Sequence, residues 1–365
     1  ILSDSIDEDV EYELQKLFDK KKVIFHNAKF DLAMLEYHFG FEFPRIEDTM
    51  LMHYMLNELP GTHGLKQLAL KHTKYGNYEQ ELHDYIASYC KRNGVLKSQF
   101  TWESIPFDVM QVYAAMDAAV TFELYELMLE ALHKNPKLVR VYKDILIPGM
   151  LFLKDCQDNG VPFDRRRLEE AQNLMEADIQ VAIEKLYSFK EVQMFEKAQG
   201  KEFNPNSTVQ LRSLLFDAIG LQPTGKKTGT GAHSTDAEVL GRLAEQHAVP
   251  NLILDIRQKS KIKNTYLDKI IPQLDRDSRL RTNFNLHSTT SGRLSSSGKL
   301  NMQQIPRDNP IVKGCIRAKE GNQIVAMDLT TAEVYVAAAL SGDRNLSEVF
   351  KSGGNFHSSI AKLVF

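Results

Sequence analysis

The stretch LHSTTSGRLSSSGKLNMQQIPR, residues 286–307, divides the chain into two differently patterned parts. It is polar, contains glycine and shows neither helical nor strand periodicity, so it is a poor candidate for a self-stabilising core. Helical patterns precede it, and an apolar run over residues 323–327 follows it and predicts a strand ending at Asp328. The role of the stretch is therefore sought in its polar side chains.

The composition is that of a globular protein. The chain has 365 residues, 43% of them apolar and 25% charged, which allows two or three cores. No run approaches the roughly 20 apolar residues of a membrane span, and Ile1 opens into an acidic segment and not into a signal sequence. We expect a cytoplasmic protein that does not associate with a membrane. We also expect Cys90, Cys156 and Cys315 to be reduced structural thiols.

Charge is unevenly distributed along the chain. Residues 1–130 hold 12 Lys and Arg against 22 Asp and Glu, a balance of −10, whereas residues 251–320 hold 14 against 6, a balance of +8. A basic segment attracts a phosphate backbone, and an acidic one supplies the ligands of divalent metal sites. A solvated helical face is the alternative explanation for either count.

The periodicity of apolar residues predicts an α/β unit followed by helices. The first unit reaches about residue 140 and contains a short strand in KKVIFH, and a second domain starts between Pro136 and Pro148. Residues 224–231 form a Gly-rich basic loop within the helical part. The predicted helices span residues 8–20, 27–39, 48–59, 65–72, 107–133, 166–186, 207–219, 235–247 and 249–274.

Two carboxylates on apolar helical stretches are candidate metal ligands. Asn27 precedes Asp31 by one helical turn and Tyr113 precedes Asp117 by one turn, so each pair is expected on one helix face. A phosphodiester hydrolase needs carboxylates to hold two Mg²⁺ ions and a phenol to orient the attacking water. Taken singly, such an Asp is more often a helix cap and such a Tyr a core residue.

Taken together, NxxxD, DTMLMHYMLN, HGLKQLALKH and YxxxD resemble the second and third motifs of DEDDy exonucleases, in the order found in the proofreading domain of family A DNA polymerases. The resemblance implies that Asp31 and Asp117 bind metal, that Tyr113 positions water and that Asn27 lies near the scissile nucleotide. The family's first motif, DxE on an early strand, is not found, so we expect that strands preceding Ile1 have been lost.

Residues 286–307 resemble the family A segment TATGRLSS followed by PNLQNIP, which lies against the minor groove of the primer-template. Long donors such as Arg293 and Gln303 suit the acceptors that every base pair presents there. The alternative for Arg293 is a pair with a surface carboxylate. The resemblance implies DNA contacts by Thr289, Arg293, Asn301, Gln303 and Gln304.

Upstream, DIRQKSKIKNTY places Arg257, Lys261 and Thr265 on one helical stripe that can follow a phosphate backbone, with Lys259 and Lys263 beside it. This stretch resembles the family's thumb-to-palm helix, and FNPNSTVQLRSLLF and HSTDAEVL resemble the thumb segments before it. The Gly-rich loop between those two segments would be the thumb tip.

Residues 324–343, IVAMDLTTAEVYVAAALSGD, resemble the palm's motif A, usually DYSQIELR. The resemblance implies that Asp328 binds both catalytic Mg²⁺ ions with the Leu329 carbonyl completing one shell, and that Glu333 and His357 contact the nucleotide. The usual Tyr, Arg and Asp are replaced by Leu329, Tyr335 and Asn355, departures that favour a phage-type member over a bacterial DNA polymerase I.

The resemblance implies an α/β plus α+β multidomain protein. Residues 1–140 would be a partial ribonuclease H-like 3′→5′ exonuclease domain, 141–279 a helical thumb, and 280–365 an incomplete palm. Its activity would be template-directed DNA synthesis with proofreading, using Mg²⁺, with Mn²⁺ as a substitute. Its partners would be primer-template DNA, single-stranded 3′ ends, deoxynucleoside triphosphates and a processivity factor or other replication proteins.

Fingers and the second palm carboxylate are not found after motif A, so we expect a fragment with impaired activity at both sites. Two other classes stay open. A stand-alone exonuclease with a helical appendage leaves the segments around Arg293 and Asp328 without a purpose. A non-enzymatic DNA-binding remnant is compatible with the missing ligands.

Overall fold

The structure is a computed structural model of the chain, and it describes residues 7–298, 300–305, 309–329, 331–353 and 355–364. Contacts divide the chain into two compact units, Ile1–Ile316 and Arg317–Phe365. Among the described residues, the first unit contains three hydrophobic cores, the second and third of which share one long helix. The second unit is a short helical segment, so the two are described separately.

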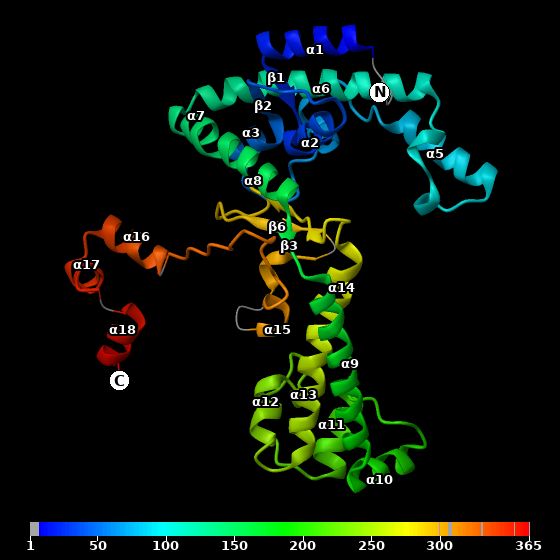
Figure 1. The fold of residues 1–365 in the computed structure, drawn as a ribbon, viewed down its shortest axis with the longest axis vertical. Helices are drawn as coiled ribbons and strands as arrows, with labels where there is room; N and C mark the ends of the chain where they lie inside the picture. The colour runs from blue at the N-terminus through cyan, green and yellow to red at the C-terminus, as the bar shows by residue number, and fades with distance from the viewer. Residues whose placement is uncertain (1–6, 299, 306–308, 330, 354, 365) are drawn as a thin grey trace. The chain divides into compact units, whose positions relative to one another are not determined.

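The first core belongs to an α/β lobe (Figure 1). Strands β1 (Val23–Phe25) and β2 (Ile46–Asp48) pair in parallel, with Phe25 opposite Asp48. Both strands lead directly into helices, α2 (Ala28–Phe39) and α3 (Thr49–Leu56). The other helices of the lobe are α1 (Glu8–Lys20), α4 (Leu65–His72), α5 (Gln80–Asn93), α6 (Phe107–His133), α7 (Pro136–Val141) and α8 (Ile147–Asn159).

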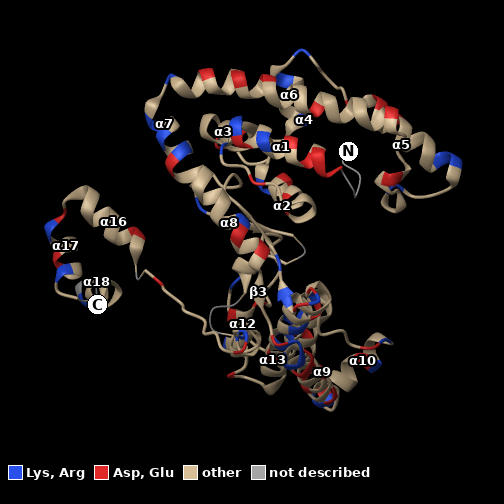
Figure 2. Ribbon diagram, turned by 45° about the horizontal axis from the view of Figure 1, so that its top comes forward, with Lys and Arg blue, Asp and Glu red and all other residues tan. Residues whose placement is uncertain are grey.

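The second core belongs to a helical lobe built around two long neighbouring helices, α9 (Arg165–Tyr187) and α13 (Ala248–Ile262), which run side by side (Figure 1). Lys259 pairs with Asp178, and the next turn places Lys263 2.8 Å from Glu176. Figure 2 shows acidic and basic residues mixed along this pair. The remaining helices are α10 (Lys190–Gln199), α11 (Thr208–Arg212) and α12 (Ala237–Leu243).

The third core joins the base of the helical lobe to the segment that follows it. Strand β3 (Val161–Pro162) pairs antiparallel with β4 (Arg279–Leu280), and Phe163 bridges to Ile316. Leu300 and Val312 are buried here, beside α14 (Asp268–Ile270) and α15 (Pro310–Lys313). This core draws residues from both sides of position 280, so the expected boundary there crosses one packed region.

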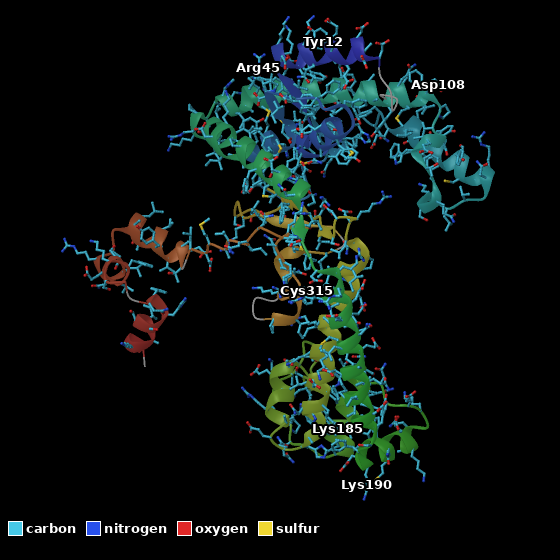
Figure 3. The ribbon with its side chains drawn as sticks, in the orientation of Figure 1. Tyr12, Arg45, Asp108, Lys185, Lys190 and Cys315 are labelled. Atoms are coloured by element: carbon cyan, nitrogen blue, oxygen red, sulfur yellow. The ribbon has the colours of Figure 1, made fainter. Side chains whose placement is uncertain are left out.

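Most predicted helices form. Residues 8–20, 65–72 and 107–133 are helical over the predicted spans. The predicted helix 249–274 divides into α13, a π-helical turn and short pieces. The division occurs because the backbone hydrogen bonds after Ile262 span five residues and not four. Helices α5 and α10 and strand β2 were not predicted. The three cysteines are free, and Cys90 and Cys315 are buried. Figure 3 labels Cys315.

The second unit contains helices α16 (Ala332–Ser341), α17 (Arg344–Lys351) and α18 (Phe356–Val364). The strand predicted over residues 323–327 does not form. None of the described strands pairs with this run, and a strand without a partner cannot satisfy its backbone groups. Val325 and Met327 are accordingly exposed. Among the described helices, none is both long enough and apolar enough to cross a membrane.

Gly160 lies at a close backbone approach in the third core. Its φ of 62° and ψ of 173° lie in a region that side chains avoid, and a Cβ there would meet the Leu280 oxygen at 3.0 Å. We expect Gly160→Ala to lower the free energy of unfolding by about 1–3 kcal/mol from backbone strain, and further from the clash. The matched control Gly200→Ala, with φ of 65° and open space, should cost about 1 kcal/mol. Equal losses in urea unfolding would contradict this account.

Candidate functional site

A single buried carboxylate organises the acidic end of the α/β lobe. Asp48 is 2% exposed and accepts backbone N–H groups from Asn27 (3.3 Å), Ala28 (2.8 Å), Met50 (2.8 Å) and Leu51 (3.2 Å). It therefore caps α2 and α3 together, which is possible because parallel pairing of β1 with β2 ends both strands at one place. Burial raises the pKa of Asp48, and these N–H bonds oppose that shift.

This cap fixes the two candidates on α2. Asn27 lies outside the helix, in a left-handed conformation with φ of 68°, so it does not share a helical face with Asp31 as predicted. Asp31 is half-buried within the first turn. Burial, together with the negative charges of Asp48 and Asp117, raises the pKa of Asp31 to about 6.

Asp117 belongs to a second cluster that sequence reasoning only partly found. Tyr113 and Asp117 lie one turn apart on α6, as predicted. Tyr78 donates to the Asp117 carboxylate at 2.5 Å, and the Lys66 ammonium pairs with the same oxygen. Lys66 also lies 4.3 Å from the ring centre of Tyr113. Lys66 lies within the quoted HGLKQLALKH motif, whereas nothing in the sequence marked Tyr78.

The electrostatics of this cluster favour a neutral phenol beside a charged pair. Burial lowers the pKa of Lys66, but the Asp117 carboxylate and the tyrosine hydroxyls raise it more. Burial and the charge of Asp117 raise the pKa of Tyr113 although Lys66 opposes this, so its hydroxyl stays protonated and able to hydrogen-bond. Such a group can orient a water molecule.

The donor set suits a divalent cation in part. Asp31 is a desolvated carboxylate next to other negative charges, an environment that a cation relieves. Within the described residues, however, no three His, Cys, Asp or Glu side chains gather as a ligand set. The metal-binding roles of Asp31 and Asp117 therefore stay predictions.

Within and just before the polar stretch, residues 283–297 form a hairpin, and residues 300–305 after it form the clamped loop. Strands β5 (Asn283–Asn285) and β6 (Ser295–Ser297) pair antiparallel, with Phe284 opposite Ser296. The amide of Gln303 accepts from the backbone N–H of Ser296 (3.1 Å) and donates to the Leu294 carbonyl (3.0 Å). The Ser296 hydroxyl donates to Asn301 (2.6 Å). The structure thus gathers Asn301 and Gln303 around β6.

The other candidates of this stretch are also anchored at their backbones. The Thr289 carbonyl accepts from Tyr54 of α3 (2.8 Å), and the Thr289 hydroxyl donates to the Arg293 carbonyl (2.7 Å). The Gln304 carbonyl accepts from Tyr266 (2.8 Å), which leaves the Gln304 side chain exposed. Arg293 is exposed at the end of the connection between the strands.

On the helical lobe, the predicted stripe separates into different environments. The Arg257 guanidinium donates to the carbonyls of Thr235 (2.7 Å) and Pro205 (3.5 Å), so it ties segments of the lobe together. Lys261 is exposed and Thr265 is partly buried. Lys259 and Lys263 are held by carboxylates of α9 and of their own segment, which reduces the net positive field of the stripe.

In the second unit the candidates are exposed. Asp328 and Leu329 lie in an extended segment ahead of α16, with Leu329 82% exposed. Glu333 lies in the first turn of α16, and His357 lies in α18. No ligand set forms around Asp328 within the described residues, so its metal role stays a prediction.

Comparison with known families identifies the chain. A model described as DNA polymerase family A matches residues 171–365, and one described as 3'-5' exonuclease matches residues 2–133. A nuclease-type lobe and a polymerase-type part therefore follow each other in one chain. Because the first match covers more than half of its length, the chain belongs to DNA polymerase family A. The fold class expected from the resemblance is confirmed.

Relatives agree with this assignment. Over its full length the chain is 49% identical to the DNA polymerase of Escherichia phage T5, of which it covers 44%. It is 31% identical to DNA polymerase I of Chloroflexus aurantiacus, with 93% of the chain aligned to 35% of that protein. It is 36% identical to the thermostable DNA polymerase I of Thermus aquaticus, with 68% of the chain aligned to 29% of that protein. The chain thus spans less than half the length of these relatives.

A solved structure shares the fold across nearly the whole chain. It is the POL domain of Pol1 from M. smegmatis in complex with DNA primer-template and dNTP, with a TM-score of 0.74 and 25% identity. The match covers 98% of this chain and 57% of that one.

One partly buried histidine predicts a pH dependence of the free energy of unfolding. His26 bonds through Nδ1 to the Thr49 hydroxyl (2.9 Å), and burial lowers its pKa to about 4. Below pH 6.5 the unfolded chain takes up a proton that the folded chain refuses until about pH 4, so stability falls as pH drops across this window. We expect a loss of about 2 kcal/mol from this residue between pH 6.5 and 4.5.

Urea unfolding at pH 7, 5.5 and 4.5 tests this contribution. His26→Gln should flatten the decline by nearly one proton, because the unfolded variant no longer gains that charge. His133→Gln, at the exposed end of α6, is the control and should follow the unaltered chain. An unchanged slope for His26→Gln would disprove the assignment.

Proposed function

We propose that this chain contributes template-directed DNA synthesis with 3′→5′ exonucleolytic proofreading in DNA replication or repair. The observation that carries the proposal is the succession of an exonuclease match and a family A polymerase match in one chain, each falling on its own candidate residues. Neither a stand-alone exonuclease nor a DNA-binding remnant accounts for both parts. The DNA primer-template and dNTP in the M. smegmatis complex support DNA and deoxynucleoside triphosphates as partners.

In the exonuclease lobe, Asp31 and Asp117 would hold Mg²⁺, or Mn²⁺ in its place. The metal would supply Lewis-acid activation of the attacking water and stabilise the leaving oxygen. The protonated hydroxyl of Tyr113 would orient that water, and Asn27, fixed by Asp48, would contact the nucleotide at a single-stranded 3′ end. Lys66 would hold Asp117 and Tyr113 in their mutual geometry.

In the polymerase part, the hairpin and the clamped loop would lie against the minor groove. Arg293 and Gln304 are exposed. Thr289, Asn301 and Gln303 hold the hairpin and the clamped loop through hydrogen bonds, and they would contact DNA at the edge of this surface. Lys261 and Thr265 would follow the phosphate backbone, with Arg257 securing the helix behind them. Asp328 and the Leu329 carbonyl would bind Mg²⁺, with Glu333 and His357 at the nucleotide. A processivity factor or other replication protein is part of the proposal.

The exonuclease assignment predicts the effect of one carboxylate on α6. Asp117→Asn should reduce Mg²⁺-dependent release of nucleotides from the 3′ end of single-stranded DNA by a factor of at least about 100, because a charged metal ligand is lost. Asp108→Asn, on the exposed start of the same helix (Figure 3), should keep the rate of the unaltered chain. Equal rates for the two variants would remove Asp117 from the site.

The DNA-binding assignment predicts a sequence-independent contribution from Lys261. Lys261→Gln should weaken primer-template binding and lower the slope of log K against log salt by about 1, since one phosphate contact is lost. Lys137→Gln, an exposed change on α7 of the exonuclease lobe, is the control and should leave the slope unchanged. Titrations between 50 and 200 mM salt, roughly the range over which such slopes are resolved, measure it. Identical slopes for Lys261→Gln and the unaltered chain would exclude the contact.

A further inference from the structure

One buried ammonium joins the exonuclease lobe to the hairpin that precedes the clamped loop. Lys29, in the first turn of α2, is only 8% exposed. Its Nζ donates to the side-chain oxygens of Gln157 on α8 (2.6 Å) and Asn283 on β5 (2.6 Å), and also to the Phe284 carbonyl. Gln157 in turn accepts from the Phe284 backbone N–H at 2.8 Å. The contacts tie one point of β5 to two helices of the other lobe.

The partners of Lys29 differ from those of the neighbouring buried lysine. Lys154 on α8 is 5% exposed and pairs with the carboxylates of Glu36 and Asp158, as buried lysines normally do. Lys29, by contrast, makes no ion pair within the described part of the chain and directs its donors to neutral oxygens. Hydrogen bonds from a charged donor are roughly twice as strong as neutral ones. A buried charge without a contacting carboxylate is costly. The hydrogen bonds from Lys29 to these neutral oxygens are therefore what holds the ammonium in place.

The hairpin connects Lys29 to the candidate DNA contacts. Phe284 lies opposite Ser296 in the β5–β6 register, and Ser296 holds Asn301 through its hydroxyl and Gln303 through its backbone N–H. On the far side of the hairpin, Tyr54 of the exonuclease lobe holds the Thr289 carbonyl. The position of the hairpin therefore depends on several contacts from a lobe that is separate in sequence, and Leu286 packs against the core of that lobe as well.

We propose that Lys29 is a positioning residue for primer-template binding: from within the exonuclease lobe, its ammonium fixes β5 and thereby the hairpin that carries Arg293 and the clamped loop that carries Asn301 and Gln303. The inference rests on the proposed function, since it assumes that this loop contacts duplex DNA. It adds a role in duplex binding for a residue of α2 that touches no DNA itself.

Two measurements on the full chain test the role, both well below the unfolding temperature. Amide hydrogen exchange of residues 283–297 without DNA reports whether the hairpin is held. Dissociation constants for a primer-template and for single-stranded DNA report whether holding it matters for duplex binding. The variants are Lys29→Met, which keeps length but removes charge and donors, and Asn283→Ala at an exposed position, which removes one acceptor of Lys29 together with the long bond from Asn283 to Ser297 (3.3 Å). Lys154→Met is the matched control.

In Lys29→Met we expect faster exchange across 283–297 and primer-template binding weakened about 3- to 30-fold, with single-stranded DNA affected less than about twofold. Asn283→Ala should change both readouts in the same direction by less, and Lys154→Met should change neither the exchange nor the ratio of the two affinities. General destabilisation would weaken both DNA affinities together, so the ratio separates positioning from loss of structure.

Unchanged exchange at 283–297 in Lys29→Met would overturn the inference, as would faster exchange with an unchanged ratio of affinities. If Lys29→Met does not fold, Asn283→Ala decides by the same two criteria. If the unaltered chain binds no primer-template, the proposed function fails and the positioning role falls with it, whereas the exchange result still decides whether Lys29 holds the hairpin.

Discussion

The carboxylate of Asp48 is the interaction on which the exonuclease lobe depends. A helix begins with backbone N–H groups that have no partner inside the helix, and two such beginnings meet where β1 and β2 end. Asp48 satisfies N–H groups of both helices, and it is buried, so no water could replace it. Tyr142 completes the arrangement, accepting from the Asp48 backbone N–H and donating to Glu47. Asp31 and Lys29 owe their places on α2 to this cap.

Helix α2 carries residues with two different roles. Asp31 is a half-buried carboxylate whose pKa is raised by burial and by the charge of Asp48, whereas Lys29, two residues earlier, contacts the hairpin. A helix spreads neighbouring residues over different faces, so a single short element can carry both a candidate metal ligand and a side chain that holds the hairpin. Opposite charges at these positions also keep their environments distinct: a carboxylate crowded by negative charge, and an ammonium surrounded by neutral oxygens.

Sequence patterns predicted much of the fold and part of the site. Periodicity placed α1, α4 and α6 at their observed bounds, because these helices are long or strongly patterned. It failed at residues 323–327, where an apolar run alone cannot supply the neighbouring strand it needs. Strand β2 was missed since a three-residue strand carries almost no periodicity, and Asn27 was placed inside a helix that it precedes in a left-handed conformation.

The sequence by itself determined the family. Motifs such as YxxxD and the polar stretch around Arg293 are defined by the spacing of neighbouring residues, and folding does not change that spacing. Only the tertiary structure decided which groups meet. Lys66 and Tyr78 reach Asp117 from 51 and 39 residues away, and Lys29 reaches Asn283 across 254 residues. Such contacts arise from packing whole elements together. No local pattern encodes them, since each side chain is an ordinary polar residue until its partner is brought beside it.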